Sequence, residues 1–204
     1  MVISYYGLGM VKVVQGDTTI AFNPIGETKD YKSINFGSDI ALVSVNDPHY
    51  NGIDHMSRGD RVPFVVDGPG EYEVSGIFVR GLGTRGPREK INTIYSLVLD
   101  EIRLAHLGAL TEPLTPETVE KLGVVDVLFV PVGGGGTLEA KQAAKMVTTL
   151  NPKIVIPVDY DDDKMLHAFL KEVGSENGKP VESLTIRRKD VADKETVVVV
   201  IQSN

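Results

Sequence analysis

The fold is decided by a helix that leads directly into a buried strand, in the stretch TPETVEKLGVVDVLFV at residues 115–130. Thr115 provides a hydroxyl N-cap, and Pro116 suits the first helical position because an amide hydrogen there would have no partner in the helix. Gly123 favours the left-handed conformation that ends a helix. Residues 124–130, apolar except for Asp126, are typical of a strand buried on both faces. The stretch therefore predicts layered α/β structure.

The same alternation continues toward the C-terminus. Thr137 is expected to cap a helix whose apolar residues repeat at helical spacing up to Leu150. A strand at residues 154–156 and a third helix at 163–173 follow, and residues 196–201 are expected to form the last strand. The acidic run that precedes the third helix is interpreted as a helix cap, because carboxylates accept hydrogen bonds from exposed amides.

The first hundred residues are expected to form mainly antiparallel strands. Val11–Val14 and Thr19–Phe22 flank a turn at residues 15–17, which predicts a hairpin. Residues 81–90, rich in glycine and charge, are expected to form a loop. Further expected strands are 40–45, 62–66, 71–74, 77–79, 92–100 and 102–106. A strand-rich half followed by strand–helix alternation predicts two mixed sheets covered by helices, in one domain over residues 1–204.

Composition excludes several classes of function. There is no cysteine, so thiolate metal sites, disulfides and a cysteine nucleophile are excluded. The formal net charge of −7 disfavours nucleic-acid binding, which needs a basic surface. The longest aliphatic run, Val197–Ile201, is far shorter than the roughly 20 residues of a membrane span. No export signal is visible, so we expect a cytoplasmic protein without nucleic-acid or membrane partners.

Six short stretches occur together in a characteristic order. They are DIALVS at 39–44, DGPGEYEV at 67–74, INTIY at 91–95, HLG at 106–108, PVGG at 131–134 followed by Thr137, and PKIVIP at 152–157. With these stretches the chain resembles the metallo-β-lactamase fold superfamily, in particular its small single-domain zinc-dependent hydrolases related to ascorbate-phosphate lactonases. The resemblance implies a four-layer αββα sandwich of two mixed β-sheets flanked by helices. It also implies a site at the sheet edges, where loops converge.

The resemblance also indicates where metal ligands would stand. In that family a strand ending in Ser or Thr is followed by His-x-His-x-Asp-His. Aligned without gaps after Ser44, the four ligand positions hold Val45, Asp47, His49 and Tyr50. The position of a bridging carboxylate holds Ala109, and that of the last histidine holds Asp159. The resemblance therefore implies that most standard ligands are replaced, and the apolar replacements predict a packed patch around Leu8, Val45 and Ala109.

Five residues are the candidates for the pocket, and none is assigned a catalytic role. They are Asp47, His49, Tyr50, His106 and Asp159. In one interpretation Asp47, His49 and Asp159 hold a divalent ion (manganese, zinc or iron). In the other, Asp47 is a turn residue, His49 is a polar group near the pocket, and His106 is a hydrogen-bonded core histidine. A shifted register would instead place Asp54 and His55 at the end of the ligand motif.

The preferred functional interpretation is a protein of this fold that has lost the standard metal ligands. Such a protein would bind a small anionic ligand or a protein partner without catalysis and without a cofactor. The alternative is a metal-dependent hydrolase of a small anionic ester or lactone that uses Asp47, His49 and Asp159. The sequence leaves the oligomeric state open.

Overall fold

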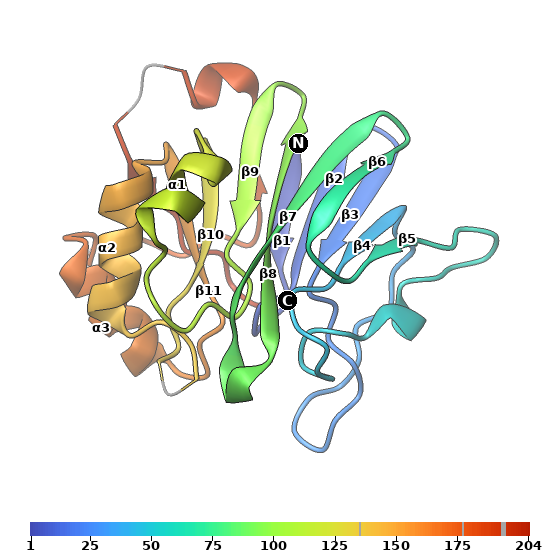
Figure 1. Cartoon of the computed structure of the whole chain (residues 1–204), viewed down its shortest axis with the longest axis horizontal. Coiled ribbons are helices and arrows are strands. Elements are labelled where there is room, and N and C mark those ends of the chain that lie inside the picture. The colour runs from blue at the N-terminus through green and yellow to red at the C-terminus, as the bar shows by residue number, and fades with distance from the viewer. Residues whose placement is uncertain (135, 177, 193–194) are drawn as a thin grey trace.

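The computed structural model describes residues 1–134, 136–176, 178–192 and 195–204, and it contains two mixed β-sheets that pack face to face (Figure 1). The six-stranded sheet has the order β12 (Leu184–Thr185), β1 (Val2–Tyr5), β2 (Val11–Gln15), β3 (Thr18–Phe22), β4 (Ile40–Leu42) and β5 (Phe64–Val66). The seven-stranded sheet has the order β13 (Val197–Val198), β11 (Ile154–Val158), β10 (Val127–Pro131), β9 (Ile102–His106), β8 (Ile91–Leu99), β7 (Ile77–Arg85) and β6 (Gly70–Val74).

The main core lies between the two sheets. Successive side chains of a strand point to opposite faces, so alternate residues of each strand meet the opposite sheet. Ile20 and Leu42 contribute from the six-stranded sheet, and Leu97, Leu104 and Phe129 from the seven-stranded sheet. The predicted hairpin is confirmed, with β2 and β3 paired from Val11 opposite Phe22 to Gln15 opposite Thr18.

Three α-helices cover the outer face of β9, β10 and β11 (Figure 1). They are α1 (Pro116–Leu122), α2 (Ala140–Leu150) and α3 (Asp163–Glu172), and short 3₁₀ helices lie at η1 (Ile53–His55), η2 (Pro87–Glu89) and η3 (Arg188–Asp190). As predicted, Thr115 caps α1 by accepting a hydrogen bond from the amide of Thr118. Two mixed sheets with flanking helices confirm the expected fold class. None of the described helices is long and apolar enough to cross a membrane.

The ends of two helices test the capping predictions. The acidic run before α3 does cap it, because the Asp162 side chain accepts a 2.9 Å hydrogen bond from the amide of Met165. The prediction for α2 was wrong. Its N-cap is Glu139 rather than Thr137, and Gln142 Oε1 accepts the Glu139 amide in a reciprocal capping arrangement. The glutamate–glutamine spacing therefore sets the start of this helix.

Half of the expected loop at residues 81–90 is strand. β7 continues to Arg85, and only the tip at 86–90 with η2 leaves the sheet. Gly81 pairs with Gly70 on one side and Tyr95 on the other. A Cβ atom on Gly81 would lie 2.9 Å from the Gly68 carbonyl oxygen, so glycine permits close backbone approach here rather than a turn.

The expected last strand, residues 196–201, is also shorter in the structure. β13 covers only Val197 and Val198, which pair with Ile154 and Val155 of β11. Ile201 forms an isolated bridge with Val181 instead. The last two residues of the run Val197–Ile201 are therefore buried, although they do not belong to the paired part of β13 and β11.

Candidate functional site

Loops from both sheets converge on a cavity of about 620 Å³. The segments that line it follow β1, β3, β4, β10 and β11, and the tip of the β7–β8 hairpin closes one side. The lining residues are Leu8, Asp30, Tyr31, Val45, Asp47, His49, Tyr50, Pro87, Arg88, Lys90, Gly133, Gly134, Gly136, Thr137, Asp159, Asp161 and Met165. The cavity therefore lies at the loop end of the sandwich, where the sequence predicts a site.

Asp47 is the centre of a charge cluster in this cavity. Its Oδ2 accepts a 2.9 Å hydrogen bond from the Lys90 ammonium, and the Arg88 guanidinium lies 3.6 Å away. Its Oδ1 lies 2.9 Å from His49 Nδ1 and also accepts the His49 amide. Burial opposes ionisation of Asp47, but the hydrogen bonds from Lys90 and His49 outweigh it and lower the pKa to about 2. Asp47 is thus an ionised, fully partnered carboxylate.

Asp159 is the second carboxyl group of the cavity, and unlike the partly buried Asp47 it is buried. The Tyr50 hydroxyl donates a 2.9 Å hydrogen bond to its Oδ2. Burial raises the pKa of Asp159 to about 7, and the Asp161 carboxylate adds to the rise, whereas the hydrogen bond from Tyr50 lowers it. Burial and the Asp159 charge also raise the pKa of the Tyr50 hydroxyl far above its ordinary value. At neutral pH Asp159 therefore exchanges between charged and neutral forms, while Tyr50 stays protonated.

The backbone holds Asp159 in an unusual conformation. Its φ is +58°, a left-handed value that aspartate adopts more readily than most residues. The Asp159 amide donates to the carbonyl oxygen of Leu8, which itself has a φ of +45°. Gly133 approaches the Asp159 carbonyl oxygen so closely that a Cβ atom would collide with it. Three loops thus fix the direction of the carboxyl group.

Apolar side chains occupy part of the same wall. Val45, Tyr50 and Ala109 form a small buried cluster, with Val45 only 2% exposed. The expected patch is present for Val45 and Ala109. Leu8 lines the cavity but packs in a different cluster, with Met10 and Ile25. Tyr50, which stands at a ligand position of the family motif and was predicted to lie in the pocket, joins the apolar patch to Asp159.

His106 lies in the core rather than on the cavity. It is fully buried, between the rings of Phe22 and Phe129. Its Nε2 lies 2.9 Å from the Gly9 carbonyl oxygen, and its Nδ1 accepts the Gly108 amide. Burial lowers the pKa of His106 to about 4, so it is neutral at physiological pH. His106 is therefore a hydrogen-bonded core histidine, the second of the two interpretations above.

Several residues of the cavity were not predicted from the sequence, and three of them, Tyr31, Arg88 and Lys90, contact its carboxylates or His49. Lys90 and Arg88 stood out only as part of a basic loop, because nothing local links them to Asp47, 43 positions before Lys90. Tyr31 donates a 2.9 Å hydrogen bond to Asp161 and lies edge-on to the His49 ring. The signal that could have found Lys90 is the hairpin itself, since its tip lies at the loop end of the sheet.

The structure separates the alternative ligand sets. Asp54 and His55 lie on η1 and are absent from the cavity lining, so the shifted register does not bring them to the site. In the described part of the chain, no three His, Asp or Glu side chains are placed so that they could hold one ion. Asp47 is bonded to Lys90 and His49, and Asp159 to Tyr50. As arranged, Asp47, His49 and Asp159 do not fit a metal ion.

Comparisons with known proteins agree with the fold. A family model described as the beta-lactamase superfamily domain matches residues 2–159. A Thermotoga maritima structure named as a Zn-dependent hydrolase of the metallo-beta-lactamase superfamily has a TM-score of 0.77 and 25% identity, and the match covers 98% of this chain and 99% of that one. A metallo hydrolase from Ignicoccus hospitalis has a TM-score of 0.66 at 16% identity, covering 98% of this chain and 94% of that one.

Curated relatives match a smaller part. A UPF0173 protein of Pyrococcus furiosus is 37% identical over 90 residues, which is 44% of this chain and 41% of the relative. A UPF0173 metal-dependent hydrolase of Thermococcus onnurineus is 34% identical over 68 residues, or 33% of this chain and 30% of the relative. The chain thus aligns with less than half the length of these relatives. The family model and the full-length structural match nevertheless agree, and this chain belongs to the beta-lactamase superfamily, with the metallo-beta-lactamase fold.

Proposed function

We propose that the chain binds a small anionic ligand in the loop cavity and does not catalyse metal-dependent hydrolysis. The observation that carries the proposal is that the partly buried Asp47 and the buried Asp159 already have partners within the chain. Lys90 bonds to Asp47, and Tyr50 bonds to Asp159. The carboxyl groups that would be needed for a metal are thereby committed to internal contacts.

Metal chemistry would have to break these contacts. A catalytic ion needs about three protein ligands and an open position for water. Lys90 supplies a positive charge at the Asp47 carboxylate, so a second cation there would meet electrostatic repulsion. Val45 and Ala109 have no atoms that can donate an electron pair to an ion. The Lys90 ammonium thus already neutralises the negative charge of Asp47.

The tip of the β7–β8 hairpin, which forms one wall of the cavity, carries positive charge that an anion could contact. Lys90 balances Asp47, which leaves the charge of Arg88 in excess on this wall. The Arg88 side chain is 78% exposed, and its planar guanidinium suits the two oxygens of a carboxylate or phosphate. Thr137 lines the same cavity, and its buried hydroxyl has no hydrogen-bond partner among the described residues. We place a bound anion at Arg88, on the side of the cavity that Thr137 also lines.

A second candidate function is hydrolysis with an atypical site. It is favoured by the curated relatives that are named metal-dependent hydrolases and by Asp159 itself. A carboxyl group with a pKa of about 7 is suited to move a proton near neutral pH. In this case Asp47, His49 and Asp159 would have to rearrange around manganese, zinc or iron before turnover.

Metal content separates the two candidates. We would dialyse the full chain against zinc, manganese and iron(II) in turn and measure bound metal by inductively coupled plasma mass spectrometry. The proposal expects less than about a tenth of an equivalent in each case, the same as in an Asp47→Asn variant. One equivalent that disappears in Asp47→Asn would favour the hydrolase and overturn the proposal.

Anion binding is tested separately by calorimetric titration with inorganic phosphate and with acetate. We expect Arg88→Ala to weaken binding at least about tenfold, since a charge-assisted hydrogen bond contributes about 1.5–3 kcal/mol. Lys145→Ala removes the same charge from the exposed side of α2 and should leave the affinity unchanged. Equal losses in both variants, or no binding of either anion, would contradict the proposal.

A further inference from the structure

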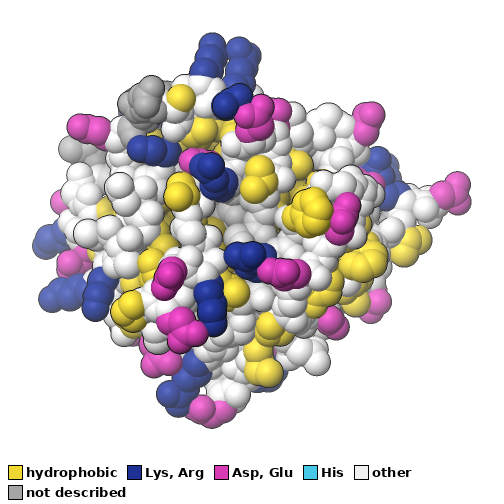
Figure 2. Space-filling model, turned by 45° about the horizontal axis from the view of Figure 1, so that its top comes forward, with side chains coloured by type: hydrophobic (Ala, Val, Ile, Leu, Met, Phe, Trp, Pro, Cys, Tyr) yellow, Lys and Arg dark blue, Asp and Glu magenta, His cyan; other side chains and the backbone are white. Residues whose placement is uncertain are grey.

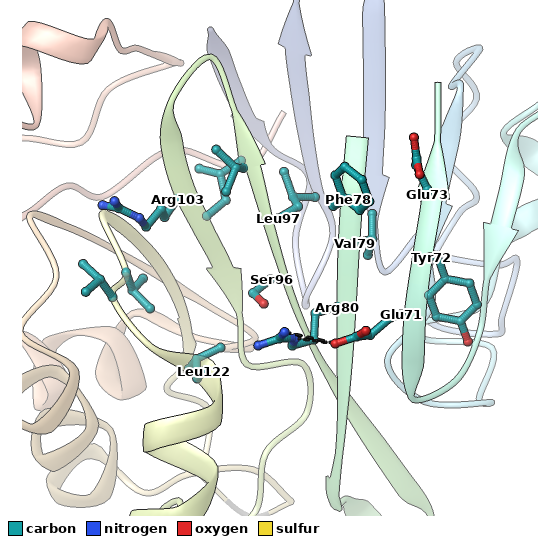
Figure 3. A pocket seen from close by; sticks show the side chains of 14 residues that line it. Glu71, Tyr72, Glu73, Phe78, Val79, Arg80, Ser96, Leu97, Arg103 and Leu122 are labelled. Atoms are coloured by element: carbon teal, nitrogen blue, oxygen red, sulfur yellow. Dashed lines mark hydrogen bonds and ion pairs between the residues drawn. The ribbon is translucent and has the colours of Figure 1, made fainter. Parts of the chain in front are cut away.

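The outer face of β6–β9 forms a shallow groove of about 490 Å³ that shares no lining residue with the loop cavity (Figure 3). The described α-helices cover β9–β11, and Ile94 of β8 packs with them, but β7 and β8 stay open on this side around Phe78 and Val98 (Figure 1). Exposed hydrophobic side chains lie among charged side chains of both signs on the surface seen in Figure 2. Phe78 is 67% exposed, Val98 53% and Val124 68%. Exposed apolar residues gathered in one groove indicate a contact surface.

The strand register places four residues that line the groove in one row across the strands. Glu73 on β6 lies opposite Phe78 on β7, and Val98 on β8 lies opposite Arg103 on β9. Val79 pairs with Leu97, which brings Phe78 and Val98 to neighbouring positions on the outward face. The row therefore begins with an acid, continues with two apolar residues and ends with a base. Figure 3 shows Phe78 between Glu73 and Arg103 across the strands.

We propose that this groove binds the same groove of a second copy of the chain, around a two-fold axis that runs along the strands between β7 and β8. Such an axis reverses the row in the second copy. Phe78 then lies over the second copy's Val98, and Glu73 lies over the second copy's Arg103. The proposal is independent of the ligand proposed for the loop cavity.

The order of charges favours a second copy over an unrelated partner. A row that runs from acid to base is complementary to its own two-fold copy, as closed symmetric dimers require. Among the described residues Glu73 has no ion-pair partner, so its charge is available for this contact. Two sheets that pack face to face keep their strands within about 30° of each other, which an axis along the strands permits.

Pairing through the free edge of β6 is a weaker arrangement. β6 is the edge strand of its sheet, and it carries Glu71 and Glu73. Two antiparallel copies of β6 around a two-fold axis would bring these like charges close together, which is destabilising. Charged residues on an edge strand are a common way to prevent such pairing. The open face of the sheet is therefore the better surface.

The size of the face sets the expected affinity. Four strands about 4.8 Å apart span about 14 Å between the outer two, and the five residues of β6 extend about 17 Å. The face therefore covers roughly 240 Å² in projection, well below the about 800 Å² per partner of a standard interface. We therefore expect weak association, with a dissociation constant of about 10⁻⁵–10⁻⁴ M. Sedimentation velocity of the full chain from about 10 µM to about 1 mM should show a shift from monomer to dimer.

Two apolar-to-acidic variants locate the surface. Phe78→Asp should weaken the dimer at least about tenfold, because it buries a charge against the second copy's Val98. Val62→Asp makes the same change at a residue that is 72% exposed and lies outside the groove, and it should leave the dimer unchanged. A chain that stays monomeric to about 1 mM would overturn the proposal and leave the face to a partner of another kind. So would a dimer that tolerates Phe78→Asp.

Charge reversal tests the two-fold arrangement. Glu73→Arg and Arg103→Glu should each weaken the dimer when present alone, since each places like charges in contact. An equimolar mixture of the two variants should associate like wild type, because every contact in the mixed pair then joins opposite charges. Arg103 also pairs with Asp126 in its own chain, so Arg103→Gln serves as a second variant if Arg103→Glu does not fold. Failure of the mixture to associate would overturn the arrangement.

Discussion

The hydroxyl of Tyr50 donates a 2.9 Å hydrogen bond to Oδ2 of Asp159, across 109 positions of sequence. The contact joins the loop after β4 to the loop after β11, so it links the two sheets at the cavity. Both residues are buried, and burial holds the pKa of Asp159 near 7. The charge on this wall of the cavity therefore changes within the physiological range of pH.

The variant Tyr50→Phe should raise the pKa of Asp159 further. A hydrogen bond donated to a carboxylate favours its charged form, and the variant removes that donor while keeping the ring in the cluster with Val45 and Ala109. We expect a loss of about 1–2 kcal/mol in the free energy of unfolding. The titration midpoint can be followed by carbon-13 NMR of the carboxyl group.

Tyr31→Phe is the matched control for that measurement. It removes a hydroxyl that donates to Asp161 at the cavity rim and leaves the Tyr50 contact in place. We expect the pKa of Asp159 to stay at about 7 in this variant. A midpoint that moves equally in both variants would show that the direct hydrogen bond is not what holds the pKa down.

Two buried groups give stability a pH dependence of opposite sign. Burial lowers the pKa of His106 from 6.5 to about 4. The free energy of unfolding therefore decreases as the pH falls through that interval, because the unfolded chain binds the proton first. Burial raises the pKa of Asp159 from 3.8 to about 7, so stability falls as the pH rises from about 4 to about 7. Each slope is at most about 1.4 kcal/mol per pH unit. Between about pH 4 and 6.5 the two slopes therefore oppose each other.

Asp159→Asn should remove one of these slopes. Asparagine tolerates the φ of +58° and can still accept the Tyr50 hydrogen bond, but it does not titrate. The free energy of unfolding of the variant should then rise with pH between about 4 and 6.5, following His106 alone. Urea denaturation across this interval measures the slope. A slope identical to that of wild type would refute the assignment of the raised pKa to Asp159.

Much of the fold could be predicted because its signals are local. Thr115, Pro116 and Gly123 mark both ends of α1, and the alternation of strands and helices indicates the layers. The error at Gly81 has a physical cause, because glycine permits a turn and close strand contact alike. The group that requires glycine at position 81 is the Gly68 carbonyl, 13 positions earlier in the sequence, so the residues next to Gly81 do not reveal the close contact.

The site was less accessible because its contacts are long-range. The resemblance placed Asp47, His49, Tyr50 and Asp159 on the cavity, yet nothing in their spacing indicates what each one contacts. Lys90 reaches Asp47 only because the β7–β8 hairpin folds over the loop after β4. The state of a carboxyl group depends on such partners, so its chemistry follows from the packing and not from its position in a motif.

Lys90→Met should destabilise the fold and raise the pKa of Asp47. The ammonium is the main group that keeps this carboxylate ionised against the cost of burial, and methionine preserves the length of the side chain. We expect a loss of about 1–3 kcal/mol at pH 7, between the values for exposed and buried ion pairs. Thermal unfolding measures it, with Lys145→Met on α2 as the control. If both variants unfold alike, the Lys90–Asp47 pair has no stabilising role.

Gly108→Ala should be the most destabilising of these changes, because the turn at Gly108 has no space for a Cβ atom. Gly108 has a φ of +64°, and a Cβ atom there would collide with Asn92 Oδ1 and lie 2.6 Å from the Ser44 side chain. Asn92 is buried and bonds to Leu107 and Ala109, so it has no room to move. Gly16→Ala is the control, since Gly16 has a similar φ of +57° with nothing near its Cβ position. It should cost only about 1 kcal/mol of strain, and Gly108→Ala at least about 2 kcal/mol more. Equal losses in urea denaturation would mean that backbone strain alone, and not the contact with Asn92, requires glycine at this turn.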